Sequence, residues 1–155
     1  MLAGVLGSTA YTWVTAFDKF GPYGCLPVGI VTLIRSKLTS AGLLQAVQAA
    51  IVAVASLAAG GGAIALPAVG VTLGLSAWAL AVTIYLAGLS PNELVYDPKV
   101  LAAHLGEVGV PIIAPVALSF ASPWLGLMSL VLAVPAALLV SAGIRRWEAA
   151  GGVFF

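Results

Sequence analysis

Charged side chains in this chain are confined to a few short stretches, and the segments between them are long and apolar. Residues 38–92 contain no Asp, Glu, Lys or Arg, and neither do residues 108–144. A water-soluble fold needs charged groups on its outward faces, because a surface without them is too apolar to remain dissolved. The pattern therefore predicts an all-α, polytopic integral membrane protein, whose apolar side chains are accepted by lipid.

The first long run divides into two predicted helices. A spanning helix needs about 20 apolar residues, and residues 38–59 meet that length before three consecutive glycines at 60–62. Glycine favours a turn, since it loses the most freedom inside a helix and readily adopts positive φ. Residues 63–89 follow at once and exceed one straight span, so tilt or a kink at Pro67 is expected. We expect a helical hairpin over residues 38–89.

The second long run, residues 110–144, must also fold back. As one α-helix its 35 residues would rise about 52 Å, far beyond the roughly 30 Å of hydrocarbon. Ser122-Pro123 is the natural corner. We expect a short or partly re-entrant arm over residues 110–122 and a full span over residues 124–144.

The remaining segments are less regular. Residues 1–17 are apolar and just long enough to span, and the absence of a preceding cation argues against a secretory signal. Residues 25–34 are too short to cross as a helix, so they either dip into the membrane or extend the following helix. Residues 90–109 are expected to form a polar loop, in which residues 99–107 are compatible with a short surface helix. About four to five membrane-embedded segments result, in a single domain over residues 1–155.

The cations agree with two hairpins. If both runs double back, five basic residues fall on one side of the membrane and the two turns, which lack charge, fall on the other. These residues are Arg35, Lys37, Lys99, Arg145 and Arg146. This is the asymmetry that the positive-inside rule expects.

Composition and charge exclude several classes of function. The chain is 62% hydrophobic and 7% charged, with a net charge of +1 and a mean hydropathy of +1.16. Without a basic run, nucleic-acid binding has no electrostatic basis. Cys25 is the single cysteine, so an internal disulfide is impossible, and a buried apolar role is favoured over a reactive thiol.

Small residues recur at helical spacing and predict helix-packing faces. In lipid, close backbone approach through such residues supplies packing energy. The candidates are Ala46, Ala49, Ala50, Ala53, Gly70 and Gly74. Packing within the chain is favoured over a specific dimer seam. Gln45 and Gln48 lie within the same predicted span, where an interhelical hydrogen bond is favoured over a pore contact, and Trp78 in mid-segment is expected to pack against another helix.

The polar candidates for a site lie in the expected loop. They are Glu93, Asp97, His104 and Glu107. His104 and Glu107, three residues apart, would share a helix face, but one histidine is a poor basis for a metal site. We expect a solvated loop at the membrane surface, with no catalytic residue, metal or cofactor. Every ionisable side chain is placed at a segment end or in this loop, which also argues against an ion-coupled transporter.

Three functions remain. The favoured one is a non-catalytic structural membrane protein that self-associates or serves as an accessory subunit of a larger assembly, such as a membrane complex or the shell of a lipid-containing virion. Its partners would be lipid and copies of itself or other apolar subunits. The alternative is a small channel or transporter for a neutral or apolar solute, because prolines 111, 115 and 123 suggest irregular backbone at membrane depth. A membrane enzyme acting through His104 ranks third.

Overall fold

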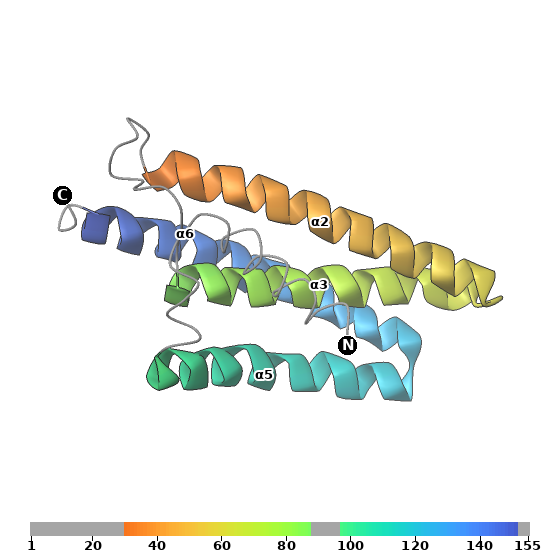
Figure 1. Cartoon of the computed structure of the whole chain (residues 1–155). Coiled ribbons are helices and arrows are strands. Elements are labelled where there is room, and N and C mark those ends of the chain that lie inside the picture. The colour runs from red at the N-terminus through yellow and green to blue at the C-terminus, as the bar shows by residue number, and fades with distance from the viewer. Residues whose placement is uncertain (1–29, 88–96, 152–155) are drawn as a thin grey trace.

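The computed structural model describes residues 30–87 and 97–151, and in this part of the chain the structure is helical with no strand. Its elements are α2 (Ile30–Ala58), α3 (Gly62–Ala87), α5 (Pro98–Ala121), the 3₁₀ helix η3 (Pro123–Leu132) and α6 (Ala133–Gly151) (Figure 1). Four helical stretches are long and apolar enough to cross a membrane, the last being η3 and α6 together. The expected all-α fold of a polytopic membrane protein is confirmed.

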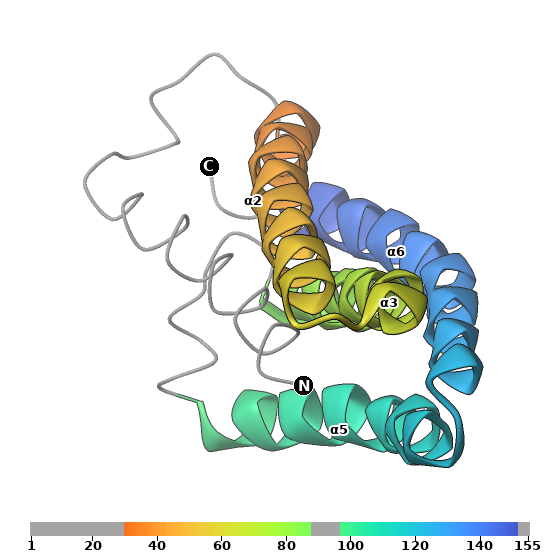
Figure 2. The same ribbon diagram turned by 90° about the vertical axis from the view of Figure 1, so that its right-hand side faces the viewer.

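Helix α3 is the centre of the bundle. Figure 2 shows it between α2 and α5, with η3 and α6 along a third side, and it contacts all four of these elements. In the apolar window of α3, 67% of residues are buried, against 11% for α2 and 6% for α5. The core therefore surrounds α3, while α2 and α5 turn most of their apolar surface outward.

The first hairpin is confirmed, and hydrogen bonds at the end of α2 explain it. Gly60 has a φ of 76°, its amide donates to Leu57 O at 3.0 Å, and the Gly61 amide donates to Ser56 O at 3.0 Å. This pair of bonds around a left-handed glycine satisfies carbonyls that the helix leaves open at its C-terminus. Only the three residues 59–61 separate the end of α2 from the start of α3.

Helix α2 begins earlier than the hydropathy pattern suggested. It starts at Ile30 rather than at residue 38, so residues 30–34 extend the following helix, one of the two options for residues 25–34. The charged turn that contains Arg35 and Lys37 is accommodated inside this helix. The predicted segment 1–17 and residues 25–29 lie outside the described residues.

The expected polar loop over residues 90–109 and the re-entrant arm over residues 110–122 are both corrected. Residues 98–121 form one 24-residue helix, α5. It begins where Asp97 accepts hydrogen bonds from the Lys99 and Val100 amides, at 2.8 and 3.5 Å, with Pro98 in the first turn, where its missing N–H costs nothing. Pro111 and Pro115 lie within this helix without ending it, as membrane helices allow.

The corner expected at Ser122-Pro123 is confirmed, and irregular backbone follows it. Residues 123–132 form a 3₁₀ helix of ten residues, whereas such runs rarely exceed three or four. Pro135 lies in the first turn of α6. Because proline cannot donate to the preceding turn and crowds it, regular α-helix starts only at Ala133.

The two ends of the bundle differ in charge. Helix α2 starts, α3 ends, α5 starts and α6 ends at the same end, and the turns 59–61 and 121–123 lie at the other (Figure 1). The five basic residues named above therefore belong to the first end, here called the basic end, and the other is called the turn end. The structure thus has the arrangement that the cations predicted.

This arrangement predicts an opposite accessibility of the two ends in a bilayer. In a Cys25→Ser background, Ala59→Cys at the turn end and Ala149→Cys at the basic end should react with a membrane-impermeant maleimide from opposite faces of sealed vesicles. Lys99→Cys should follow Ala149→Cys, because α5 starts where α6 ends. Labelling of Ala59→Cys and Lys99→Cys from the same face would contradict the topology.

Candidate functional site

Glycines form the contact between α3 and η3. A Cβ atom on Gly74 would collide with the backbone carbonyl of Ser129, and one on Gly70 would collide with the Leu127 side chain. The fully buried Ser129 hydroxyl donates to Gly70 O at 3.3 Å. Two backbones therefore lie closer together here than any larger residue would permit. We call this contact the glycine seam.

The six helix-packing candidates have different environments. Gly70 and Gly74 lie in the glycine seam, in a contact within the chain. On α2, Ala49 is buried and Ala53 is half-buried, whereas Ala46 and Ala50 are exposed. The structure therefore brings the two glycines together with η3 and leaves part of the alanine pattern on the outside of the bundle.

The two glutamines of α2 also have different environments. Gln45 Nε2 donates to Ser76 O of α3 at 3.3 Å, which is the interhelical bond that the sequence favoured. The Gln48 amide oxygen is buried without a hydrogen-bond partner among the described residues. Neither side chain lines the cavities described below.

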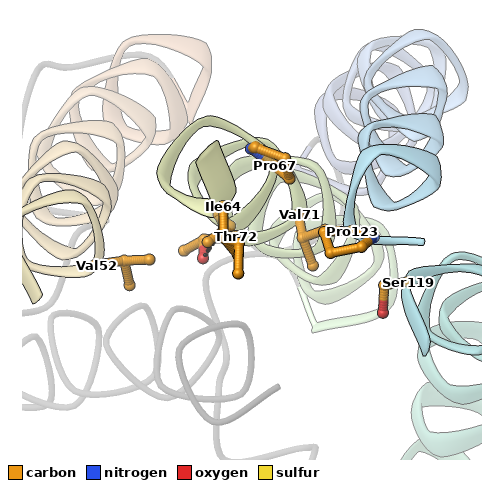
Figure 3. Close-up of a pocket in the computed structure, with 8 residues that line it drawn as sticks. Val52, Ile64, Pro67, Val71, Thr72, Ser119 and Pro123 are labelled. Carbon is orange, nitrogen blue, oxygen red and sulfur yellow. Dashed lines mark hydrogen bonds between the residues drawn. The ribbon is translucent and has the colours of Figure 1, made fainter. Parts of the chain in front are cut away.

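A cavity of about 340 Å³ lies near the turn end. Figure 3 shows its lining side chains, which come from α2, α3, α5 and η3: Val52, Ile64, Pro67, Ala68, Val71, Thr72, Ser119 and Pro123. The Thr72 hydroxyl donates to Ala68 O at 2.8 Å and the Ser119 hydroxyl to Val116 O at 2.7 Å. Both donors are thus used within their own helices, and the walls suit an apolar or neutral molecule.

At the basic end, α6 caps the end of α3. Trp147 Nε1 donates to Ile84 O at 2.9 Å, and the Arg146 guanidinium donates to Tyr85 O at 3.2 Å. These carbonyls belong to the last turn of α3, where helical partners are missing. The Arg146 guanidinium also lies 5.2 Å from the centroid of the Tyr85 ring, within the range of a cation–π contact. Arg146 and Trp147 therefore stabilise the C-terminal end of α3.

The polar candidates of the expected loop lie on α5 instead. Asp97 is its exposed N-cap, His104 is half-buried and Glu107 is exposed, while Glu93 lies outside the described residues. His104 and Glu107 are the seventh and tenth residues of a helix of spanning length. The expectation that His104 and Glu107 lie in a loop outside the apolar segments is therefore wrong.

These residues form no metal centre in the described ranges 30–87 and 97–151, where no three His, Cys, Asp or Glu side chains come together. The His104 Nδ1 atom is buried and has no hydrogen-bond partner in the same ranges. The sequence was compatible with a short surface helix over residues 99–107, but a helix of spanning length was not predicted here, although Asp97-Pro98 is a typical start of a helix.

A second cavity, of about 210 Å³, lies where α3, α5 and α6 meet. Its walls are Val82, Tyr85 and Leu86 of α3, Ala103 and Glu107 of α5, and Leu139 of α6. Next to it, buried Trp78 donates from Nε1 to the Glu107 carbonyl at 2.9 Å, which confirms that this tryptophan packs against another helix. We call this space the Glu107 cavity.

The chain matches no protein-family model, no curated protein and no solved structure. The class that the fold defines over residues 30–87 and 97–151 is a bundle of four apolar helices of membrane-spanning length.

Proposed function

We propose that this chain is a non-catalytic, structural integral membrane protein that acts by association of helix faces, with copies of itself or as an accessory subunit of a larger assembly. The observation that carries the proposal is the unequal burial of the bundle. In α3, 67% of the residues of the apolar window are buried, whereas α2 and α5 have long apolar faces that the described bundle leaves uncovered. Lipid or other apolar subunits would cover them.

The outward face of α2 has the composition of an association face. Large apolar side chains there are widely exposed, with Leu43 at 67% and Ile51 at 62%. Beside them, the small residues Gly42, Ala46 and Ala50 are exposed at every fourth position. Small residues at this spacing let a second helix approach closely, which is how helices gain contact energy in lipid. The glycine seam is already occupied within the chain, so α2 is the face that we assign to assembly.

The mass of the native particle, extracted together with its lipid, tests this proposal. We expect a particle with several chains, and we expect Ala46→Leu with Ala50→Leu to shift the distribution toward smaller species, because added bulk separates the helices. Ala114→Leu with Ala117→Leu, which adds the same bulk at two exposed positions of α5, is the matched control and should leave the mass unchanged. A stable monomer of the unmodified chain under mild extraction would refute the proposal.

A second function, a small channel or transporter for a neutral or apolar solute, is favoured by the cavity at the turn end. The irregular segment that was expected over residues 110–122 is part of the regular helix α5 up to Ala121. The irregular η3, however, borders this cavity through Pro123. Irregular backbone at membrane depth often lines a passage.

Flux of a small neutral solute into liposomes tests this alternative. Val52→Trp fills the cavity from α2 and should abolish flux, whereas Val54→Trp, on the 66% exposed outer face, should not. Equal flux with both variants, or none with the unmodified chain, would exclude transport through this cavity.

A further inference from the structure

The backbone of Glu107 lies far from both ends of α5, although the residue is exposed on the bundle. It is the tenth of 24 residues in α5, so about 14 Å of helix separate it from Pro98 at 1.5 Å per residue. The bond from Trp78 Nε1 to the Glu107 carbonyl gives the same depth independently, because Trp78 is the seventeenth of 26 residues in α3. In a bilayer with about 30 Å of hydrocarbon, both residues lie well inside the apolar layer.

A carboxylate at this depth needs compensation. Charged side chains inside membranes are costly and therefore face a cavity, pair with another group or bind a ligand. Within residues 30–87 and 97–151, no side chain forms an ion pair or hydrogen bond with the Glu107 carboxylate. His104, one turn away on the same helix, forms no hydrogen bond with it either. Glu107 instead lines the Glu107 cavity, together with five residues of α3, α5 and α6.

The dimensions and walls of this cavity limit what it can hold. Its volume of about 210 Å³ exceeds the roughly 150 Å³ of an apolar cavity that accepts benzene. Val82, Leu86 and Leu139 make the walls apolar, and among the described residues Glu107 is the only charged one that lines the cavity. A matching ligand combines one positive charge with an apolar body slightly larger than a benzene ring.

We propose that the Glu107 cavity binds a small primary ammonium ion, of the size of benzylammonium, with its charged group on the Glu107 carboxylate and its ring among the apolar walls. This site goes beyond the structural function proposed above and does not depend on it. An ammonium group supplies both the positive charge and the hydrogen-bond donors that the carboxylate lacks. Intramembrane ionisable residues typically mark such sites.

Other ligand classes fit less well. A bare metal cation needs several oxygen ligands, and among the described residues that line the cavity only Glu107 and Tyr85 have side-chain oxygens. An anion would be repelled by Glu107, and a lipid chain would leave the carboxylate without a counter-charge. Arg146 lies over the Tyr85 ring and disfavours a second positive charge on that side. The ammonium group is therefore placed at Glu107, with the apolar body directed toward the other walls.

Binding of 4-fluorobenzylammonium to the full chain in detergent micelles, followed by ¹⁹F NMR, tests the proposal. We expect saturable binding at least tenfold tighter than that of 4-fluorobenzyl alcohol, which has nearly the same shape but no charge. Glu107→Gln should remove this tenfold preference, and Ala103→Leu, which fills the cavity, should weaken both ligands. Glu148→Gln, which removes an exposed carboxylate at the basic end, is the matched control and should change neither.

Two results would overturn the assignment. One is equal binding of the ammonium ion and the alcohol by the unmodified chain, a comparison that does not depend on how any variant folds. The other is an ammonium preference that persists in a folded Glu107→Gln protein, which would place the counter-charge elsewhere. The mass of the particle decides the structural proposal separately, so the two can fail independently.

Discussion

Replacement of Gly74 by alanine is expected to lower the free energy of unfolding by about 3 kcal/mol, the upper part of the usual range for overpacking a well-packed contact. The new methyl group would meet the backbone carbonyl of Ser129 rather than a movable side-chain tip. Relief therefore requires η3 to move away from α3. That movement would also disturb the bond from the Ser129 hydroxyl to Gly70 O. Unfolding in mixed detergent micelles with increasing dodecyl sulfate, followed by circular dichroism, measures the change.

Gly106→Ala is the matched control for this prediction. Gly106 also lies within a helix, but a Cβ there would meet nothing within 4 Å. The same substitution should therefore be neutral or stabilising by up to about 1 kcal/mol, because alanine is the better helix former. Equal stability of the two variants would show that α3 and η3 are not in close contact at Gly74.

The hairpin of α2 and α3 could be predicted because its signals are local. Two apolar stretches of spanning length meet at three glycines, and Gly60 adopts the positive φ that this turn requires. The corner at Ser122-Pro123 was equally clear, since a single helix of residues 110–144 would be too long for the bilayer. Fold class and the separation of basic and uncharged ends follow from these turns and from the positions of the cations.

The full length of α5 was not predicted, because the polar residues in its first half were taken as evidence for a loop. Lys99, His104 and Glu107 interrupt the apolar pattern, and Pro111 and Pro115 suggested a break. In the structure, Asp97 caps the helix and the prolines are contained within it. Hydropathy alone does not separate a solvated loop from a helix that places a few polar groups at a cavity, because that difference depends on tertiary neighbours such as Trp78 and Tyr85.

The Glu107 cavity was unpredictable for the same reason. Its walls come from three helices, α3, α5 and α6, and from residues that extend along the chain from Val82 to Leu139. Glu107 was a candidate from the sequence, but as part of a surface loop. Its depth became clear only from the hydrogen bond that joins its carbonyl to Trp78. The glycine seam shows the opposite case, since Gly70 and Gly74 were identified by spacing, and only their partner on η3 was unknown.

Replacement of Trp78 by alanine is the second large effect, with an expected loss of about 3 to 5 kcal/mol in the free energy of unfolding. Trp78 is 9% exposed and packs in a cluster with Ala81, Val82 and Ala136, against Val108 and Ile112 among others. Because lipid is as apolar as the core, this cost comes from lost contacts and a lost hydrogen bond more than from transfer to water. The same detergent titration measures it.

Two further variants separate the contribution of the Trp78 hydrogen bond from that of its packing. Trp78→Phe keeps most of the ring volume but removes the donor to Glu107 O, so it should cost about 1 kcal/mol for the hydrogen bond, plus a smaller packing loss. Trp124→Ala is the control, because Trp124 is 54% exposed on η3 and should lose less than about 1 kcal/mol, as surface positions usually do. If Trp78→Ala were as mild as Trp124→Ala, α3 and α5 would not meet at this tryptophan. The depth assigned to Glu107, and with it the ammonium site, would then lose its independent support.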